Sequence, residues 1–330
     1  MKNNKIYYGV GPLMYTPAYN ESIAQNLIKQ KFGTNYSLSF CLEDTVNDNF
    51  VKQAEEQLIK SVNEIYEAEQ KKDFDLPKLF IRVREPNQII ELSKALGDSI
   101  ELITGFIVPK FSLEVFEWYR NALLKASEIT KKKLYIMPIY ESKFLIDPRK
   151  RLENLFSLKE VLSEIEELVL NIRVGGNDLS NYFGFRRHSD ESIHRIKPIA
   201  DVFSDIISVY GMDYIVSGPV WEYYLGDNWE EGLRREIKDD LLCGFIGKTV
   251  IHPNQIPVVN DAYKVSKDDY EDAKTILEWD YSRINFVSGS NTNSRMNEVK
   301  THVNWARKIM YLADQFGIKE GELNINGNLV

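Results

Sequence analysis

The chain has 330 residues, of which 43% are hydrophobic and 27% charged, enough for one large domain with an extension or for two modest domains. Its net charge of −8, without a basic stripe, argues against a nucleic-acid-binding protein. The sequence has no run of eighteen apolar residues that could span a membrane and no apolar N-terminal run typical of a signal peptide. Its two cysteines are far apart, so we expect a cytoplasmic protein.

Short β-branched or aromatic runs alternate with helical patterns along most of the chain. We predict strands near residues 7–10 and at 36–42, 79–83, 103–108, 133–138, 171–174, 214–217 and 245–251. Apolar residues at helical spacing follow most of them, as in 51–65, 89–96, 115–126 and 156–170. Eight such units over roughly 250 residues are typical of an α/β fold of the (β/α)8 TIM-barrel type. A doubly wound sheet is the competing layout, but Gly9-Val10-Gly11-Pro12 lacks the third glycine of its dinucleotide turn.

The pattern changes from about residue 261. A helix is predicted over 268–280, then a polar loop at 288–291 and a final helix from about Met296. We therefore predict a barrel domain over residues 1–260 and a C-terminal helical extension over 261–330. The extension would pack on the barrel or on a neighbouring subunit, which suggests a homo-oligomer.

Charged residues and glycines recur where the predicted strands end, which is where a barrel carries its chemistry. In chain order they are Glu43 and Asp44, Arg82 and Arg84, Lys110, Glu141, and Gly175-Gly176-Asn177-Asp178. A single carboxylate after a strand is as often a helix N-cap, and Asp44 or Asp178 could each be one. Charges at five successive strand ends are harder to explain by capping.

The carboxylates Glu43, Asp44, Glu141 and Asp178 would crowd one rim, and like charges that close need a compensating cation. The four histidines are scattered, which argues against zinc or copper and favours Mg²⁺ with oxygen ligands. A 2-oxo acid can chelate such an ion, which polarises the ketone while an arginine stabilises the enolate formed when the adjacent C–C bond breaks. Backbone N–H groups of the Gly-Gly turn can bind the substrate carboxylate.

Several motifs then become recognisable between about residues 38 and 256. They are L-E-D-T-V at 42–46, I-R-V at 81–83, P-K at 109–110, P-I-Y-E-S at 138–142, G-G-N-D-L at 175–179, G-F-I-G-K at 244–248 and I-H-P-N-Q-I at 251–256. In this order they resemble the motifs of the citrate lyase β-subunit / HpcH–HpaI aldolase family. Gly247-Lys248-Thr249 is not a P-loop, because Leu242 stands where that motif has glycine, and we expect Lys248 at the bottom or rim of the barrel.

The resemblance implies a Mg²⁺-dependent carbon–carbon lyase or aldolase that acts on a 2-oxo acid or an acyl-CoA-like substrate through a metal-stabilised enolate. It implies that Glu141 and Asp178 are the metal ligands and that Arg82 binds the oxo acid and stabilises the enolate. Glu43 and Asp44 would orient metal-bound water and Arg82.

Substrate contacts are expected from the Gly176–Asn177 turn, from Lys110 and from Arg186. Lys110 could equally well be a charged residue at the rim that does not contact the substrate. Arg186 could instead form a salt bridge at the surface.

The sequence differs from the family at three places. Arg84 stands where asparagine is common, Tyr140 is an additional residue in its motif, and Glu298 stands nearest to a C-terminal catalytic aspartate that is often delivered by a neighbouring subunit. Glu298 could take over as the acid. Two other functions stay open: a non-catalytic metabolite-binding barrel, and phosphoenolpyruvate-type chemistry on the same fold.

Overall fold

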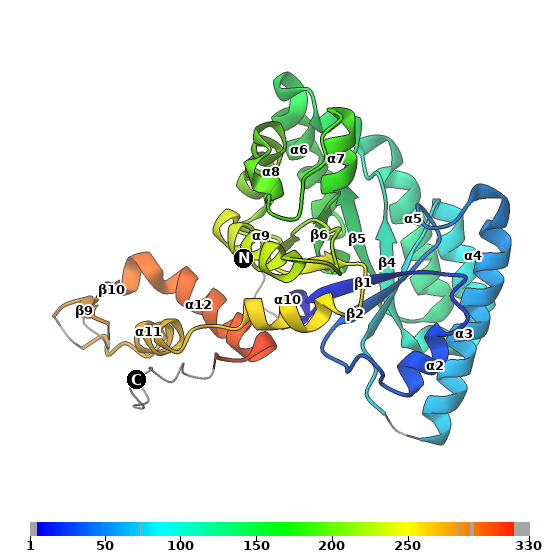
Figure 1. Cartoon of the computed structure of the whole chain (residues 1–330), viewed down its shortest axis with the longest axis horizontal. Coiled ribbons are helices and arrows are strands. Elements are labelled where there is room, and N and C mark those ends of the chain that lie inside the picture. The colour runs from blue at the N-terminus through cyan, green and yellow to red at the C-terminus, as the bar shows by residue number, and fades with distance from the viewer. Residues whose placement is uncertain (1–4, 73, 283, 291–293, 320–330) are drawn as a thin grey trace. The chain divides into compact units, whose positions relative to one another are not determined.

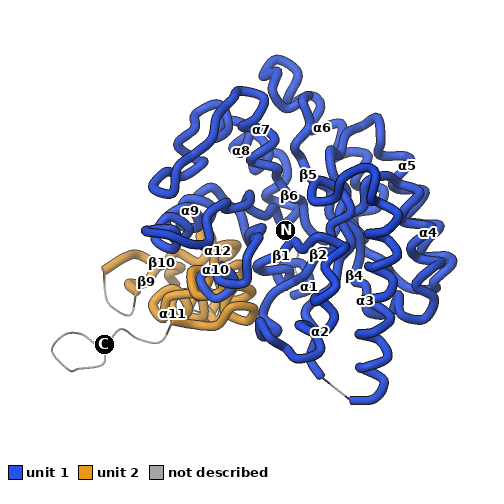
Figure 2. Tube along the Cα trace, turned by 45° about the vertical axis from the view of Figure 1, so that its right-hand side comes forward, with its two compact units in different colours: residues 1–259 blue, residues 260–330 orange. Residues whose placement is uncertain are grey.

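The computed structural model describes residues 5–72, 74–282, 284–290 and 294–319. The chain divides into two compact units, Met1–Val259 and Asn260–Val330 (Figure 2).

Within its described residues, the first unit is built around eight parallel strands (Figure 1). They are β1 Pro12–Pro17, β2 Ser37–Cys41, β3 Lys78–Arg82, β4 Ile103–Val108, β5 Tyr135–Tyr140, β6 Ile172–Val174, β7 Val216–Ser217 and β8 Lys248–Val250. Their order is β7-β6-β5-β4-β3-β2-β1-β8. A parallel bridge between Gly218 and Lys248 joins the two ends of this order, and the N–H of Gly218 donates to the carbonyl of Gly247 over 3.0 Å. The TIM barrel predicted from the alternation of strands and helices is therefore confirmed.

A helix follows each strand of the barrel. These are α2 Ile23–Ile28, α3 Val51–Lys71, α4 Pro86–Leu96, α5 Leu113–Thr130, α6 Pro148–Ser163, α7 Gly176–Tyr182 with α8 Lys197–Tyr210, α9 Trp229–Cys243 and α10 Gln255–Tyr263; α1 Lys5–Tyr8 precedes β1. Short 3₁₀ turns lie at Asp48–Phe50, Gly97–Leu102, Lys143–Leu145, Glu166–Leu168 and Ile193–Arg195. In α3 the stripe Ala54, Leu58, Val62 and Ile65 is fully buried, as its helical spacing predicts.

The inside of the ring is packed by apolar side chains. Leu13 of β1, Phe80 of β3, Ile107 of β4 and Met137 of β5 belong to one buried cluster. Because the barrel is filled rather than hollow, open space for chemistry is left at the strand ends.

The second unit contains α11 Lys267–Leu277, β9 Val287–Gly289, β10 Met296–Glu298 and α12 Val299–Phe316. The two helices pack through Ala273 and Ile276 against Ala306. In neither unit do the described residues form a helix long and apolar enough to cross a membrane.

The strand predicted near residues 7–10 is wrong. Lys5–Tyr8 forms one helical turn, and the first strand begins at Pro12, after Gly11 with φ of +60°. Tyr8 and Val10 are buried, but a short apolar run does not distinguish a helical turn from a strand.

The helix predicted over 156–170 is misplaced. It begins at Pro148, where the Asp147 side chain accepts the N–H of Arg149 as an N-cap, and it ends at Ser163. Beyond it the chain turns so that Val169 can pair with Ile136 of β5, which ends the helical geometry.

The final helix begins later than predicted. Met296–Glu298 is a strand paired antiparallel with Val287–Gly289, so residues predicted as loop and helix form a small hairpin sheet instead. Asn291 of the predicted loop lies outside the described residues.

Candidate active site

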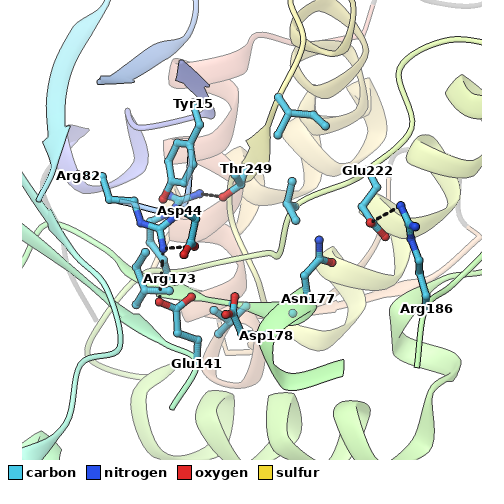
Figure 3. A pocket seen from close by; sticks show the side chains of 16 residues that line it. Tyr15, Asp44, Arg82, Glu141, Arg173, Asn177, Asp178, Arg186, Glu222 and Thr249 are labelled. Atoms are coloured by element: carbon cyan, nitrogen blue, oxygen red, sulfur yellow. Dashed lines mark hydrogen bonds and ion pairs between the residues drawn. The ribbon is translucent and has the colours of Figure 1, made fainter. Parts of the chain in front are cut away.

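A cavity of about 400 Å³ opens at the carboxyl ends of the strands. Its lining combines side chains from strands and loops that are far apart in the sequence: Tyr15, Asp44, Arg82, Glu141, Arg173, Asn177, Asp178 and Thr249 (Figure 3). Parallel strands bring their carboxyl ends to one edge, which is why these residues meet.

Arg82, the last residue of β3, is surrounded by carboxylates. Its Nη2 lies 2.6 Å from Glu43, 2.9 Å from Asp44 and 3.6 Å from Glu141. Arg82 is only 5% exposed, so these attractions act with little screening by water. Burial by itself would raise the pKa of Asp44, but Arg82, Glu43 and Lys110 together outweigh it and hold that pKa below its usual value.

Glu141 follows β5 and is 3% exposed. One of its oxygens accepts the backbone N–H of Lys110 over 2.9 Å. Burial raises the pKa of Glu141 to about 8, and the charge of Asp178 adds to the rise although Arg82 opposes it. The pKa of Asp178 is raised as well, by burial and by Asp44. Burial disfavours the charged form of both carboxylates, and a cation held beside them would stabilise that form.

The Gly175-Gly176 turn allows this arrangement to pack. A Cβ on Gly175 would lie 2.3 Å from Oε2 of Glu141, and one on Gly176 would lie 2.7 Å from Cβ of Pro219. Only glycine fits at either position, and it brings the backbone at the start of α7 next to the carboxylates.

Lys110 joins two of the predicted site residues. Its Nζ lies 2.7 Å from Oε1 of Glu43, and the hydrogen bond to Glu43 raises the pKa of Lys110. Its backbone has φ of +48°, an unfavourable value for lysine that directs its N–H to Glu141. Its side chain is 58% exposed and does not line the 400 Å³ cavity.

Arg186 and Asn177 line the cavity away from the carboxylate pair. Arg186 is 79% exposed and lies 3.3 Å from Glu222, so both its predicted features, a place at the site and a surface ion pair, are present. The Asn177 side chain accepts from Arg187 over 3.4 Å. Figure 3 shows Asn177, Glu222 and Arg186 together on one side of the cavity.

Two of the residues that depart from the family pattern, Arg84 and Tyr140, do not line the cavity. Arg84 donates to the backbone carbonyls of Leu42, Glu43 and Val46, so it holds the loop that carries Glu43 and Asp44.

Tyr140 is fully buried and donates to the hydroxyl of Tyr210 in α8, so it points away from the site. Glu298 precedes α12 in the second unit, and its backbone N–H donates to His302.

Among the cavity residues that sequence reasoning missed are Tyr15, Arg173 and Thr249. One signal was available for Arg173, because a charged residue between Ile172 and Val174 stands inside a strand with no polar neighbour. A charge in a buried strand requires either compensation or a ligand. Tyr15 and Thr249 carry no such signal.

The donor set suits a hard divalent cation. Among the described residues, no group of three or more His, Cys, Asp or Glu side chains is placed to hold a metal ion, so these residues can offer at most two such ligands at one site. Glu141 and Asp178 offer oxygen atoms on the wall of an open cavity. Mg²⁺ is typically held by one or two carboxylates and keeps positions for water and substrate, whereas structural zinc needs a closed set of nitrogen or sulfur ligands.

Three comparisons with known proteins bear on the identity of the chain. No curated protein matches it. Among solved structures, CitE from Mycobacterium tuberculosis in complex with magnesium, acetoacetate and coenzyme A is 16% identical, with a TM-score of 0.60, and the match covers 93% of this chain and 99% of that one. RipC from Yersinia pestis is 18% identical, with a TM-score of 0.52, over 78% of this chain and 95% of that one.

The citrate lyase β subunit from M. tuberculosis, complexed with oxaloacetate and magnesium, is 18% identical, with a TM-score of 0.50, over 79% of this chain and 99% of that one. At such identities the likeness shows a shared fold. A family model described as C–C bond lyase of the TIM-barrel fold matches residues 4–318, nearly the whole length. The chain therefore belongs to the C–C bond lyase family of the TIM-barrel fold and is a carbon–carbon lyase.

Proposed function

We propose that this lyase makes or breaks a carbon–carbon bond next to a 2-oxo acid and uses Mg²⁺ held by Glu141 and Asp178. The observation that carries the proposal is the pair of close carboxylates with raised pKa values beside the buried Arg82. The solved structures of CitE and the citrate lyase β subunit were obtained with magnesium and small 2-oxo or 3-oxo acids, which supports the same chemistry here.

Each residue of the site has a part in this proposal. The bound Mg²⁺ would supply a Lewis acid that polarises the keto group of the substrate. Arg82 faces the same space and would stabilise negative charge as the enolate forms, since it is already oriented and desolvated. Glu43 and Asp44 hold the Arg82 guanidinium in place.

The remaining predicted contacts serve to bind and orient the substrate. Backbone N–H groups of Gly176 and Asn177 would receive its carboxylate, because the glycine turn exposes them beside Glu141. Lys110 orients Glu43 and Glu141, and Arg186 would attract an anionic tail from the outer side. Glu298 as the acid, an acyl-CoA-like substrate, cytoplasmic location and a homo-oligomer stay predictions.

The first test is metal binding. Glu141→Gln and Asp178→Asn should each lower the affinity for Mg²⁺ at least about tenfold in calorimetry, because an anionic ligand becomes neutral. Glu222→Gln is the matched control: it removes a carboxylate from the same cavity, one paired with Arg186. Unchanged Mg²⁺ affinity in both ligand variants would contradict the assignment.

The second test is enolisation. With Mg²⁺ present, the protein should exchange the methyl protons of pyruvate for deuterium, measured by NMR, and the exchange should stop on chelation of the metal. Metal binding without exchange of any 2-oxo acid would instead favour the non-catalytic barrel. A product that depends on phosphate would favour phosphoenolpyruvate chemistry.

A further inference from the structure

Arg187 is a buried arginine to which the proposed mechanism gives no role. It lies between α7 and α8, is 3% exposed and does not line the 400 Å³ cavity of the carboxylate pair. It lines a neighbouring hollow of about 310 Å³, whereas Asn177 lines both spaces. The Asn177 side chain therefore stands between Arg187 and the cavity.

The Arg187 guanidinium is anchored on the side away from the cavity. Its Nε lies 2.9 Å from Oε2 of Glu236 in α9, and its Nη2 donates to Oε1 of the same residue over 3.1 Å. Nη2 also donates to the carbonyl of Val220, and the guanidinium carbon lies 5.2 Å from the centre of the Trp221 ring. Contacts at two different nitrogens and against an aromatic ring fix the plane of the guanidinium.

The remaining nitrogen of Arg187 decides which end of the Asn177 amide faces the cavity. Nη1 donates to Oδ1 of Asn177 over 3.4 Å and lies 3.9 Å from Glu222. Because arginine can only donate hydrogen bonds, the amide must turn its oxygen toward Arg187. The amide nitrogen Nδ2 is on the other branch of the side chain and has no hydrogen-bond partner within the part of the chain that the structure describes.

This nitrogen is placed beside the proposed metal site. Figure 3 shows Asn177 on the cavity wall between Asp178 and Glu222. An amide N–H₂ group in this position offers hydrogen bonds to an acceptor oxygen of a ligand in the cavity.

We propose that Arg187 is a positioning residue, which holds the Asn177 amide so that Nδ2 donates to the carboxylate of the bound oxo acid. That carboxylate is the one that the backbone of the Gly176–Asn177 turn would receive. Arg187 does not touch the substrate and acts through Asn177. This inference rests on the proposed function, because it takes the oxo acid as bound beside Asp178.

The test is a double-mutant cycle on the exchange of pyruvate protons with saturating Mg²⁺, in which the dependence on pyruvate concentration gives KM and kcat separately. Arg187→Met and Asn177→Ala should each raise KM about 10-fold, the size expected for one hydrogen bond to a charged group, and change kcat less than about threefold. The double variant should have the same KM as Asn177→Ala, because Arg187 acts only through that amide.

Two further variants separate positioning from folding. Arg187→Lys keeps a positive charge opposite Glu236 but has a single nitrogen, so it should fold and still raise KM at least about threefold; it replaces Arg187→Met in the cycle if that variant does not fold. Arg151→Met is the matched control, because Arg151 is 6% exposed and pairs with Asp205 outside the cavity. It should lower stability in urea unfolding and leave KM unchanged.

Three outcomes would overturn the role of Arg187. They are a KM in the double variant that multiplies the two single effects, an unchanged KM in the folded Arg187 variants, and a KM raised equally by Arg151→Met. Absence of Mg²⁺-dependent exchange in the wild-type protein would overturn the proposed function, and the inference with it.

Discussion

Arg82 forms ion pairs with three carboxylates of the proposed site. Its guanidinium joins Glu43, Asp44 and Glu141, which come from two different strand ends. All three carboxylates approach the same atom, Nη2, and so hold that end of the guanidinium in place. A cation oriented before the reaction stabilises developing charge without reorganising, which is the usual source of electrostatic catalysis.

Substitution of Arg82 tests whether its charge stabilises the enolate. Arg82→Ala should leave Mg²⁺ affinity within a few-fold of the wild type, because the ligands Glu141 and Asp178 remain. The rate of pyruvate proton exchange should fall about 100- to 1000-fold. NMR measures the rate of proton exchange, and calorimetry measures the affinity for Mg²⁺. Near-normal exchange would remove Arg82 from the mechanism, and a partial recovery in Arg82→Lys would show that charge contributes apart from the planar geometry.

The loop between β2 and α3 carries Glu43 and Asp44. Arg84, which follows the neighbouring strand β3, holds this loop through hydrogen bonds. Its guanidinium donates to three backbone carbonyls, at 3.2 Å to Leu42, 3.0 Å to Glu43 and 2.7 Å to Val46. Backbone groups in a loop otherwise need water or each other as partners. An arginine two residues beyond Arg82 therefore sets the position of the acids that hold Arg82.

Arg84→Ala should destabilise the fold by about 2 kcal/mol in urea unfolding, since several carbonyls lose a charged donor. Proton exchange should slow as Glu43 and Asp44 move, while Mg²⁺ affinity should change little. Arg120→Ala is the control, a helix arginine in surface ion pairs with Glu117 and Glu164. If Arg84→Ala lowered stability but left exchange unchanged, its influence on the site would be excluded.

At the scale of the first unit, β8, α9 and the loop before α8 are joined by a buried charge cluster. Lys248 lies 2.8 Å from Glu236 and 2.7 Å from Asp240, and Nε2 of His194 lies 2.7 Å from Asp240. Lys248 is the first residue of β8, at the amino-terminal end of the strand where the bottom of a barrel lies, and it is fully buried. Burial lowers the pKa of His194, but its hydrogen bonds to Asp240 and Cys243 outweigh this and raise the pKa from 6.5 to about 9.

This cluster makes stability depend on pH. A histidine whose pKa is higher in the folded state stabilises that state fully below its unfolded pKa of 6.5, and the contribution is lost as pH rises through 9. We expect the free energy of unfolding to fall by about 1–3 kcal/mol between pH 6 and pH 9.5 in urea titrations. His194→Gln should flatten the dependence, whereas the exposed His188→Gln should not. A wild-type stability that rises over this range would contradict the prediction.

The sequence by itself determined the architecture and part of the set of residues at the rim. Alternating strand and helix patterns specify a barrel, and parallel strands deliver their carboxyl ends to one edge, so Glu43, Arg82, Glu141 and Asp178 could be grouped before any contact was known. The sequence did not determine every boundary of the helices and strands. The apolar run at 7–10 is too short to show the periodicity that distinguishes a turn of helix from a strand.

The tertiary structure alone decided which side chains face each other. Arg173 and Thr249 are 76 residues apart and meet because ring closure brings β6 and β8 to the same mouth. Whether Lys248 faces solvent, the cavity or a helix depends on strand register and tilt, which local pattern does not encode. The proposed chemistry could therefore be predicted from the order of the strand ends, whereas the contacts between side chains from different strands depend on distances that exist only after the barrel has closed.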